Sequence, residues 1–281
     1  MLSQKVFIGS QTATKMQRFK NQGLSNLRII SDFDRTLTQA YANDEPVPTS
    51  FSILEKSGIL SSNYVFRVQQ LYNKYRQIEL DNNLNYDIKT EKMKEWWLLT
   101  MKAIVEEKMH RETFKSLASS EKIVWRTGAV QLLNFSKQQQ LPFAILSAGL
   151  GNVIEEFINF HQVTFDLLKI MANYFKFSQT GLAEEYIQPL IHSVNKSESV
   201  MSQYLTSQEI ADRHNVILLG DQLGDAGMCS NTDQIQVLKI GFLNENIEDN
   251  LLKFQTAFDV VLTGDAPLDY VGDFLSSLVP A

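Results

Sequence analysis

Two aspartates one residue apart follow directly on an apolar run in the segment IISDFDRTLT, residues 29–38. Side chains at positions i and i+2 of an extended chain point the same way, so Asp32 and Asp34 can face one site while Phe33 packs behind them. Two carboxylates at this separation repel each other, and one pKa rises unless a cation lies between them. Mg²⁺ removes that repulsion, because it prefers one or two carboxylates together with water and phosphate oxygens. The pair therefore indicates metal-assisted chemistry on a phosphate.

The same pair offers a division of labour in the hydrolysis of a phosphate ester. One aspartate can attack phosphorus and form an aspartyl-phosphate, which splits a difficult hydrolysis into two easier steps. The other can donate a proton to the leaving oxygen. The structural alternative is a polar strand end, with Asp34 or Thr36 capping a helix.

A second apolar run ends in residues that suit a phosphate oxygen. Ser147 follows a predicted strand at 141–146 and precedes the small residues Ala148 and Gly149. A hydroxyl and free backbone N–H groups near a helix start can bind an anion. A simple turn with Ser147 as an N-cap explains the same residues without a ligand.

A third run, NVILLGD, ends in Asp221, and Asp225 follows one turn later. Asp221 could complete the shell of the metal ion, and Asp225 could orient it. A dianionic phosphate also needs a cation from the protein. Lys196, after a predicted hairpin of NYFKF and EYIQPLIH, is a candidate, although its spacing does not distinguish it from other lysines.

The elements that must position these residues read as a parallel α/β fold. Short apolar runs suit strands buried on both faces, and they occur at 27–34, 141–149, 215–221 and 258–265. Helical patterns such as 128–140 and 151–161 alternate with them, which favours a parallel sheet. In such sheets ligands bind beyond the carboxyl ends of the strands, so the motifs are expected to converge there.

The segment 45–122 has a different character. It opens with the proline-containing linker DEPVPTS, and no strand pattern interrupts the rest of the segment. One predicted helix covers 63–79, and a second carries apolar residues along one side: Met93, Trp96, Trp97, Met101 and Ile104. We expect a helical cap at 45–122, inserted into an α/β catalytic core formed by 1–44 and 123–281.

Composition narrows the classes of function. The 281 residues are 44% hydrophobic and carry a net charge of −6, which fits an ordinary globular protein and argues against binding to a nucleic-acid polymer. One cysteine, Cys229, excludes an intrachain disulfide and fits a reducing compartment. The N-terminus lacks a signal-peptide pattern, and no run reaches the ~18 apolar residues of a membrane span. These features predict a cytoplasmic protein without membrane partners, and they are compatible with a monomer.

Taken in this order, the motifs resemble those of the haloacid dehalogenase superfamily of phosphatases. Longer segments, among them FAILSAGLGNVIEEFI and VILLGDQLGDAGM, are similar to the cytosolic type III 5′-nucleotidase family, also called pyrimidine 5′-nucleotidases. The resemblance runs from about residue 25 to near the C-terminus and is weakest in the cap. It implies a three-layer, Rossmann-like core with an inserted helical cap, and a Mg²⁺-dependent 5′-nucleotidase.

The resemblance also implies roles for the core residues. Asp32 matches the nucleophile and a Mg²⁺ ligand, and Asp34 matches the general acid, with its backbone carbonyl on the metal. Asp221 matches the third metal ligand and Asp225 a supporting acid, while Lys196 matches the lysine that holds the phosphoryl group.

Other matched positions bind the substrate. The family's phosphate loop matches Ser147, Ala148 and Gly149, and its base-binding positions match Glu79, Trp97 and Thr100. From their patterns alone, Glu79 reads more simply as a solvated charge. The adjacent tryptophans Trp96 and Trp97 are more often core residues, but a helix packed on one partner can hardly bury both, so one is expected to face the cleft.

The sequence also departs from the family at three positions. Arg35 brings a cation to the mouth of the site, and Ser52 stands where an aromatic or histidine contact is expected, which leaves the second wall of the base pocket undefined. Trp97 offers an electron-rich face that suits a cationic, methylated purine. Both 7-methylguanosine monophosphate and the pyrimidine nucleotides CMP and UMP are therefore candidate substrates.

The sequence thus predicts hydrolysis of nucleoside 5′-monophosphates through an aspartyl-phosphate, with phosphotransfer to a nucleoside as a side reaction. Two alternatives remain: a related phosphatase of another small metabolite such as phosphoserine, or a catalytically silent nucleotide-binding protein.

Overall fold

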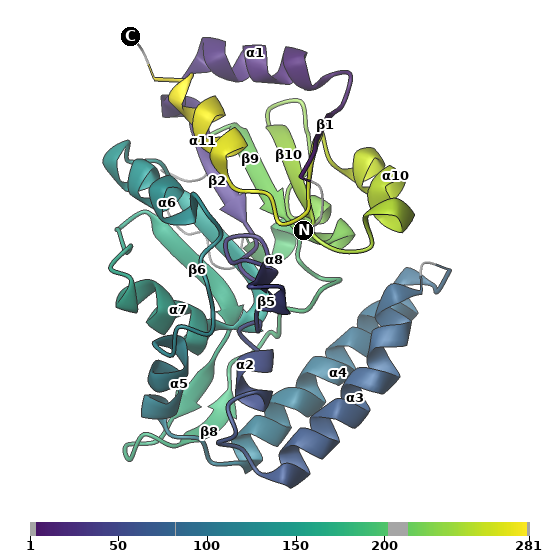
Figure 1. The fold of residues 1–281 in the computed structure, drawn as a ribbon, viewed down its shortest axis with the longest axis vertical. Coiled ribbons are helices and arrows are strands. Elements are labelled where there is room, and N and C mark those ends of the chain that lie inside the picture. The colour runs from purple at the N-terminus through teal and green to yellow at the C-terminus, as the bar shows by residue number, and fades with distance from the viewer. Residues whose placement is uncertain (1–3, 82, 202–212, 280–281) are drawn as a thin grey trace.

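The computed structural model describes residues 4–81, 83–201 and 213–279. Within them a seven-stranded sheet has the order β1-β11-β10-β9-β2-β5-β6 (Figure 1). Its strands are β1 (Val6–Ile8), β2 (Leu27–Ser31), β5 (Phe143–Leu150), β6 (Leu168–Asn173), β9 (Asn215–Gly220), β10 (Gln236–Leu243) and β11 (Val260–Thr263). Two small hairpins lie outside it: β3 (Tyr41–Ala42) with β4 (Glu45–Pro46), and β7 (Phe175–Phe177) with β8 (Ala183–Tyr186).

The strands from β11 to β6 pair in parallel, as the sequence predicts, and β1 joins the edge antiparallel to β11. The sequence analysis missed β1. It has three residues, and Val6 and Ile8 are exposed, so it carries neither the length nor the burial pattern that identified the inner strands. The predicted hairpin is present as β7–β8, but its second strand spans Ala183–Tyr186 and ends well before His192, the last residue of the predicted strand.

Helices cover both faces of the sheet, and others lie outside it. The helices of the described residues are α1 (Thr12–Gln22), α2 (Ser52–Glu55), α3 (Ser62–Leu80), α4 (Tyr86–Glu106), α5 (Arg111–Ala118), α6 (Ala129–Gln138), α7 (Gly151–Phe160), α8 (Glu198–Met201), α10 (Ile247–Ala257) and α11 (Asp269–Ser276). None of the helices in the described residues combines the length and apolar composition needed to cross a bilayer.

Alternation along the central strands builds two hydrophobic layers. Ile29 of β2 packs into a cluster with residues of α1, α6, α7 and α11. Its neighbour Ile30 packs into a second cluster with residues of α8 and α10. Successive strand residues point to opposite faces, so these clusters lie on the two sides of the sheet. The predicted three-layer α/β architecture is confirmed.

The segment 45–122 contains α2, α3, α4 and α5, and β4 at its start. Helices α3 and α4 lie side by side as a pair that extends away from the sheet (Figure 1). Helix α5 instead packs against α7. The expectation that no strand occurs in this segment is wrong for β4, since a two-residue strand leaves no alternation to detect.

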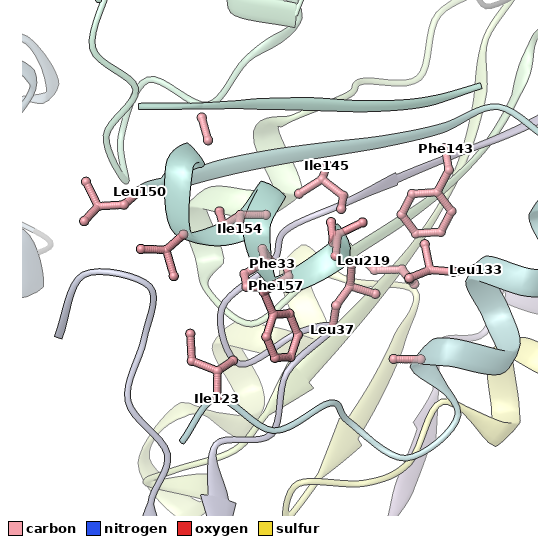
Figure 2. Packing of buried hydrophobic residues seen from close by; sticks show 14 of the residues in the cluster. Phe33, Leu37, Ile123, Leu133, Phe143, Ile145, Leu150, Ile154, Phe157 and Leu219 are labelled. Carbon is pink, nitrogen blue, oxygen red and sulfur yellow. The ribbon is translucent and has the colours of Figure 1, made fainter. Parts of the chain in front are cut away.

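The core anchors the residue between the two leading aspartates. Phe33 is fully buried, and its ring centroid lies 6.0 Å from that of Trp125 and 5.8 Å from that of Phe157, both edge to face. Figure 2 shows Phe33 and Phe157 together in the packed cluster. With Phe33 held behind, Asp32 and Asp34 are left on the side away from this core, as the i, i+2 spacing predicts.

Candidate active site

Three neighbouring strands deliver the chemistry-bearing residues to one edge of the sheet. β2 lies between β9 and β5, so Asp32 after β2, Asp221 after β9 and Ser147 in β5 come together. A single pocket is lined by all the predicted site residues except Asp225, namely Asp32, Asp34, Glu79, Trp97, Thr100, Ser147, Ala148, Gly149, Lys196 and Asp221. The expected convergence at the carboxyl ends of the strands is confirmed.

Lys196 lies at the centre of the charged groups. Its Nζ is 2.7 Å from Asp32 Oδ1 and 2.9 Å from Asp225 Oδ1, and all three side chains are buried. Burial lowers the pKa of Lys196, but the two carboxylates outweigh it and leave that pKa above its ordinary value. Sequence spacing alone could not distinguish Lys196 from other lysines as the cation of the site. Its contacts with Asp32 and Asp225 identify it.

The carboxylates of Asp32, Asp221 and Asp225 each place an oxygen within 4.8 Å of the others. Burial, and then the neighbouring acids, raise the pKa of Asp221, and burial raises the pKa of Asp32 to about 7. Asp221 Oδ1 is buried and has no hydrogen-bond partner among the residues that the structure describes. The single positive charge of Lys196 cannot balance the negative charges of three buried aspartates. A divalent metal ion therefore fits this set of oxygen ligands.

Asp225 holds the turn rather than facing the pocket. Its Oδ2 accepts hydrogen bonds from the backbone N–H groups of Asp221, at 3.0 Å, and Gln222, at 2.8 Å. Its Oδ1 accepts from Lys196. With both oxygens engaged by protein donors, Asp225 is placed to orient Asp221 and Lys196.

The carboxyl group of Asp34 accepts two hydrogen bonds from Ser50, a residue that the sequence analysis did not select. The backbone N–H of Ser50 donates to Asp34 Oδ1 at 2.7 Å, and the Ser50 hydroxyl donates to Asp34 Oδ2 at 2.6 Å. Burial raises the pKa of Asp34, and the two Ser50 hydrogen bonds oppose that rise. A single serine in a polar linker carries no periodicity, so only the folded chain identifies it.

The predicted end of the strand at 146 is wrong, because β5 continues to Leu150. Its pairing with β6 is regular as far as Leu146, breaks, and resumes where Leu150 pairs with Asn173. Ser147 to Gly149 therefore form an irregularity within the strand rather than a turn after it, and α7 starts directly at Gly151.

Hydrogen bonds from within the segment and from two other elements fix the conformation of residues 147–149. Ser147 Oγ accepts from the Gly149 N–H at 3.1 Å. The Ala148 carbonyl accepts from Asn173 Nδ2 and from Trp97 Nε1, each at 2.8 Å. Because the carbonyl points to these donors, the peptide is fixed, and Asn173 and Trp97 support the loop proposed to bind phosphate.

The predicted base-reading residues line the pocket from α3 and α4. The Glu79 side chain is only 10% exposed and pairs with Arg76, another pocket residue, so it is not the solvated charge that its pattern suggested. Thr100 Oγ1 is buried and unpartnered among the described residues. Both residues line the pocket and are largely shielded from solvent.

Aromatic rings complete the pocket. Trp97 meets Phe51 edge to face with the centroids 6.4 Å apart, and Trp96 stacks on Tyr75 at 5.9 Å. Both tryptophans line the pocket, although only one was expected to face it. Phe51, beside Ser52, supplies an aromatic wall where the sequence left the pocket undefined.

Arg35 also lines the pocket and forms an ion pair with Glu245 at 2.7 Å. Its backbone adopts a φ of 60°, and its carbonyl accepts from Arg126 and Asn244. The cation noted at the mouth is thus already paired in the protein.

A parallel sheet with an acidic cluster and a lysine at its carboxyl edge defines a phosphatase of the haloacid dehalogenase fold. The chain belongs to the pyrimidine 5′-nucleotidase (UMPH-1) family, whose model matches residues 35–279. It is accordingly a 5′-nucleotidase, a phosphoric monoester hydrolase, and the resemblance drawn from its motifs is confirmed.

Relatives match over nearly the whole chain. A 7-methylguanosine phosphate-specific 5′-nucleotidase from Gallus gallus is 33% identical over 261 residues, 92% of this chain and 90% of its own. The corresponding Homo sapiens protein is 31% identical over 258 residues, 92% and 86% of the two chains. The crystal structure of cytosolic 5′-nucleotidase IIIB bound to cytidine superposes with a TM-score of 0.88 at 28% identity, covering 97% of this chain and 93% of that one.

A substrate-bound phosphoserine phosphatase shares the fold alone, with a TM-score of 0.53 at 16% identity over 89% of this chain and 98% of its own.

Proposed function

We propose that this 5′-nucleotidase is Mg²⁺-dependent and works through an aspartyl-phosphate on Asp32. The observation that carries the proposal is the buried contact of Lys196 with Asp32 inside the acidic cluster. A nucleophilic carboxylate beside a cation can receive a phosphate dianion.

The metal ion would be held by the carboxylates of Asp32 and Asp221 and by the backbone carbonyl of Asp34. When bound, Mg²⁺ supplies the positive charge that offsets the developing charge on the phosphoryl oxygens. Asp225 supports this set through its hydrogen bonds to the Asp221 turn.

The reaction proceeds in two steps. An Asp32 oxygen attacks phosphorus, the bond from phosphorus to the nucleoside 5′-oxygen breaks, and Asp34 gives its proton to that oxygen. Asp34, now ionised, takes a proton from water, whose oxygen attacks phosphorus and releases phosphate from Asp32. Lys196 and the Ser147 loop hold the phosphoryl oxygens throughout. A nucleoside hydroxyl replacing water gives phosphotransfer as a side reaction.

For the base, we propose 7-methylguanosine monophosphate and CMP as substrates, with UMP as a further candidate. The relatives named for 7-methylguanosine phosphate and the cytidine-bound structure support this range. The indole of Trp97 and the ring of Phe51 suit a cationic purine. Glu79 can accept from the exocyclic amine of cytosine or from the amino and N–H edge of guanine. Thr100 offers a hydroxyl to the base or sugar.

We further propose that residues 45–122 act as a cap on a core of 1–44 and 123–281. Helices α3 and α4 contribute Glu79, Trp97 and Thr100, and closure of such an element excludes water from the reacting phosphate. The proposed partner is the small nucleotide alone, with no nucleic-acid polymer, and the protein is proposed to be a cytoplasmic monomer. The burial of its one cysteine, Cys229, fits this location.

The test is release of inorganic phosphate from CMP, UMP, 7-methyl-GMP, AMP and phosphoserine with Mg²⁺, repeated with the Asp32→Asn variant. Hydrolysis of CMP or 7-methyl-GMP that is lost in Asp32→Asn supports the proposal. Retained hydrolysis in that variant contradicts the covalent mechanism. Preference for phosphoserine would identify the alternative phosphatase, and nucleotide binding without turnover would identify a silent binding protein.

A further inference from the structure

We infer that Ser50 is a positioning residue for Asp34, holding its carboxyl group in the plane needed for proton transfer. The inference rests on the proposed role of Asp34 as the general acid and concerns how that group is oriented.

The contact between the two residues is bidentate. Ser50 donates from its backbone nitrogen to Oδ1 at 2.7 Å and from its hydroxyl to Oδ2 at 2.6 Å. Ser50 is fully buried, so solvent does not compete for either hydrogen bond. Because both oxygens are held by one residue, rotation of the carboxyl group about its bond to Cβ breaks at least one of the two hydrogen bonds.

A third hydrogen bond fixes the direction of the hydroxyl. The backbone N–H of Leu150 donates to Ser50 Oγ at 3.2 Å. The oxygen is therefore an acceptor toward the end of β5, and its own hydrogen is directed to Asp34 Oδ2. Ser50 thus connects the carboxyl group of Asp34 by hydrogen bonds to the end of β5, the strand that carries the proposed phosphate loop.

Gly149 packs closely against this contact. A Cβ at Gly149 would lie 2.0 Å from Ser50 Oγ and 2.8 Å from Asp34 Oδ2, so only glycine allows these three residues to meet. Glycine at this position explains how a hydroxyl, an acid and the phosphate loop share so small a space.

Ser50 lies in a connecting segment of the chain rather than in the strand that precedes Asp34. It lies between β4 and α2, in the segment that leads from the sheet into the helices of the pocket. The orientation of Asp34 is therefore set by this connection as well as by β2. Ser50 neither gains nor loses a proton in the reaction; it keeps Asp34 aligned while Asp34 protonates the leaving oxygen and later takes a proton from water.

The experiment compares two leaving groups in a Ser50→Ala variant that keeps the backbone donor and removes the hydroxyl. With CMP or 7-methyl-GMP, whose alkoxide must be protonated as it leaves, the single-turnover rate of Asp32 phosphorylation is expected to fall about 10- to 100-fold. With p-nitrophenyl phosphate, whose phenolate leaves without protonation, it is expected to fall by less than about threefold. The KM for the nucleotide is expected to change by less than about twofold, because ground-state binding is untouched.

Two further variants make the result interpretable. Ser57→Ala removes a hydroxyl that donates to the Leu54 carbonyl at 2.6 Å, at the end of α2 and outside the pocket lining, and it is expected to leave both rates unchanged. Ser50→Cys replaces the hydroxyl by a slightly larger and weaker donor, and its rate with the nucleotide is expected to lie between those of wild type and Ser50→Ala. It serves as the test variant if Ser50→Ala does not fold.

Three outcomes decide the matter. A loss confined to the nucleotide supports the positioning role. An equal loss on both substrates in a variant with a wild-type circular dichroism spectrum, or no loss at all, overturns it. The Asp34→Asn variant separates failure of the proposed function from failure of the Ser50 role. Nucleotide hydrolysis that survives in Asp34→Asn contradicts the proposed function itself and not only the role of Ser50.

Discussion

At the scale of single residues, the ammonium group of Lys196 holds together charges that would otherwise repel. It lies within 2.9 Å of both Asp32 and Asp225. Since all three side chains are buried, solvent screens their charges little, and the attraction is stronger than at the surface. Substitution of one partner leaves the others unbalanced, which is why effects on these residues are not expected to be additive.

Glu79 is expected to decide which bases are accepted. Its carboxylate lines the pocket with Arg76, and a good bidentate contact to a base edge contributes about 1–3 kcal/mol of discrimination. In Glu79→Gln, kcat/KM for 7-methyl-GMP or CMP should fall about 10- to 100-fold relative to AMP. The exposed Glu91 of α4 provides the control, and the substrate ranking measured with Glu91→Gln should match wild type. An unchanged ranking in Glu79→Gln would contradict the assignment.

His192 should make folding stability depend on pH. It is 2% exposed, its Nδ1 accepts from the Val194 N–H at 3.3 Å, and burial, followed by the charge of Lys94, lowers its pKa to about 4. The unfolded chain takes up the proton near the ordinary pKa of about 6.5. The contribution of neutral His192 is therefore complete above that value and is lost as the pH falls toward 4.

Between pH 7.5 and pH 5, wild type should lose about 2 kcal/mol of unfolding free energy more than His192→Gln does. Urea denaturation of both proteins at the two pH values measures this difference, and taking the difference cancels the acids of the active site. Parallel pH dependence in the two proteins would show that His192 is protonated without cost.

At the scale of elements, one hydrogen bond joins a helix of the pocket to the phosphate loop. Trp97 Nε1 of α4 donates to the Ala148 carbonyl at 2.8 Å. The residue proposed to stack on the base therefore also supports the loop proposed to bind phosphate, and in this proposal base binding and phosphate binding share one hydrogen bond.

Trp97→Phe keeps an aromatic face and removes the donor. A hydrogen bond of about 0.5–1.5 kcal/mol predicts roughly a 2- to 12-fold weaker inhibition by inorganic phosphate, a ligand without a base. Trp96→Phe is the comparison, since that ring stacks on Tyr75, and it should leave phosphate inhibition unchanged. Equal inhibition constants for Trp97→Phe and wild type would argue against the brace.

The buried guanidinium of Arg126 ties together loops behind the site. It donates to the carbonyls of Thr36 and Ala266, each at 2.7 Å, and pairs with Asp265 at 2.9 Å. Burial lowers its pKa to about 10, so it stays charged at neutral pH. Arg126→Met should cost about 3–5 kcal/mol in urea denaturation, because several acceptors lose their partner. Arg18→Met, on an exposed position of α1, should change stability by less than about 0.5 kcal/mol.

The inner elements were predictable because each has a pattern that burial imposes. β2, β9 and β11 are short runs of mainly apolar residues, and α3 shows a helical repeat, so these elements could be predicted without a structure. The acids at the strand ends were predictable for a related reason, since parallel strands present their carboxyl ends together. The core fold and most of the pocket thus came from local pattern and from family resemblance.

The features that could not be predicted depend on contacts between segments far apart in the chain. Ser50 lies 16 residues from Asp34 and 100 from Leu150, and nothing in its own neighbourhood marks it. Asn173 supports Ala148 from β6, again without a motif. The extension of β5 past 146 was missed because small residues such as Ala148 and Gly149 resemble a turn, whereas pairing resumes beyond them.

At the scale of the whole molecule, metal binding should be coupled to folding. The acids at the ends of β2 and β9 come together only in the native chain, so the proposed Mg²⁺ ion should bind the folded state preferentially. At about 100 times its dissociation constant, Mg²⁺ should add about 2.7 kcal/mol of stability. Chelation with EDTA should lower the thermal midpoint and abolish phosphate release, and Mg²⁺ should restore both.

Asp221→Asn is the matched variant for this measurement. It removes the carboxylate whose Oδ1 is unpartnered within the described part of the chain, so the thermal midpoint of the variant should no longer respond to Mg²⁺. A full Mg²⁺ response in Asp221→Asn would place the ion elsewhere in the protein.

The helices that line the base side of the pocket enter the chain between β2 and β5, after Asp34 and before Ser147. The two ends of the proposed insertion lie close together on the core, where Thr38 pairs with Trp125, so the strands need not shift when the sequence of the insertion changes. The helices of the insertion can change in sequence, and with them the substrate specificity, while the catalytic residues at the strand ends stay the same. In this architecture, diversification of substrate choice and preservation of chemistry become separable problems for evolution and for protein engineering.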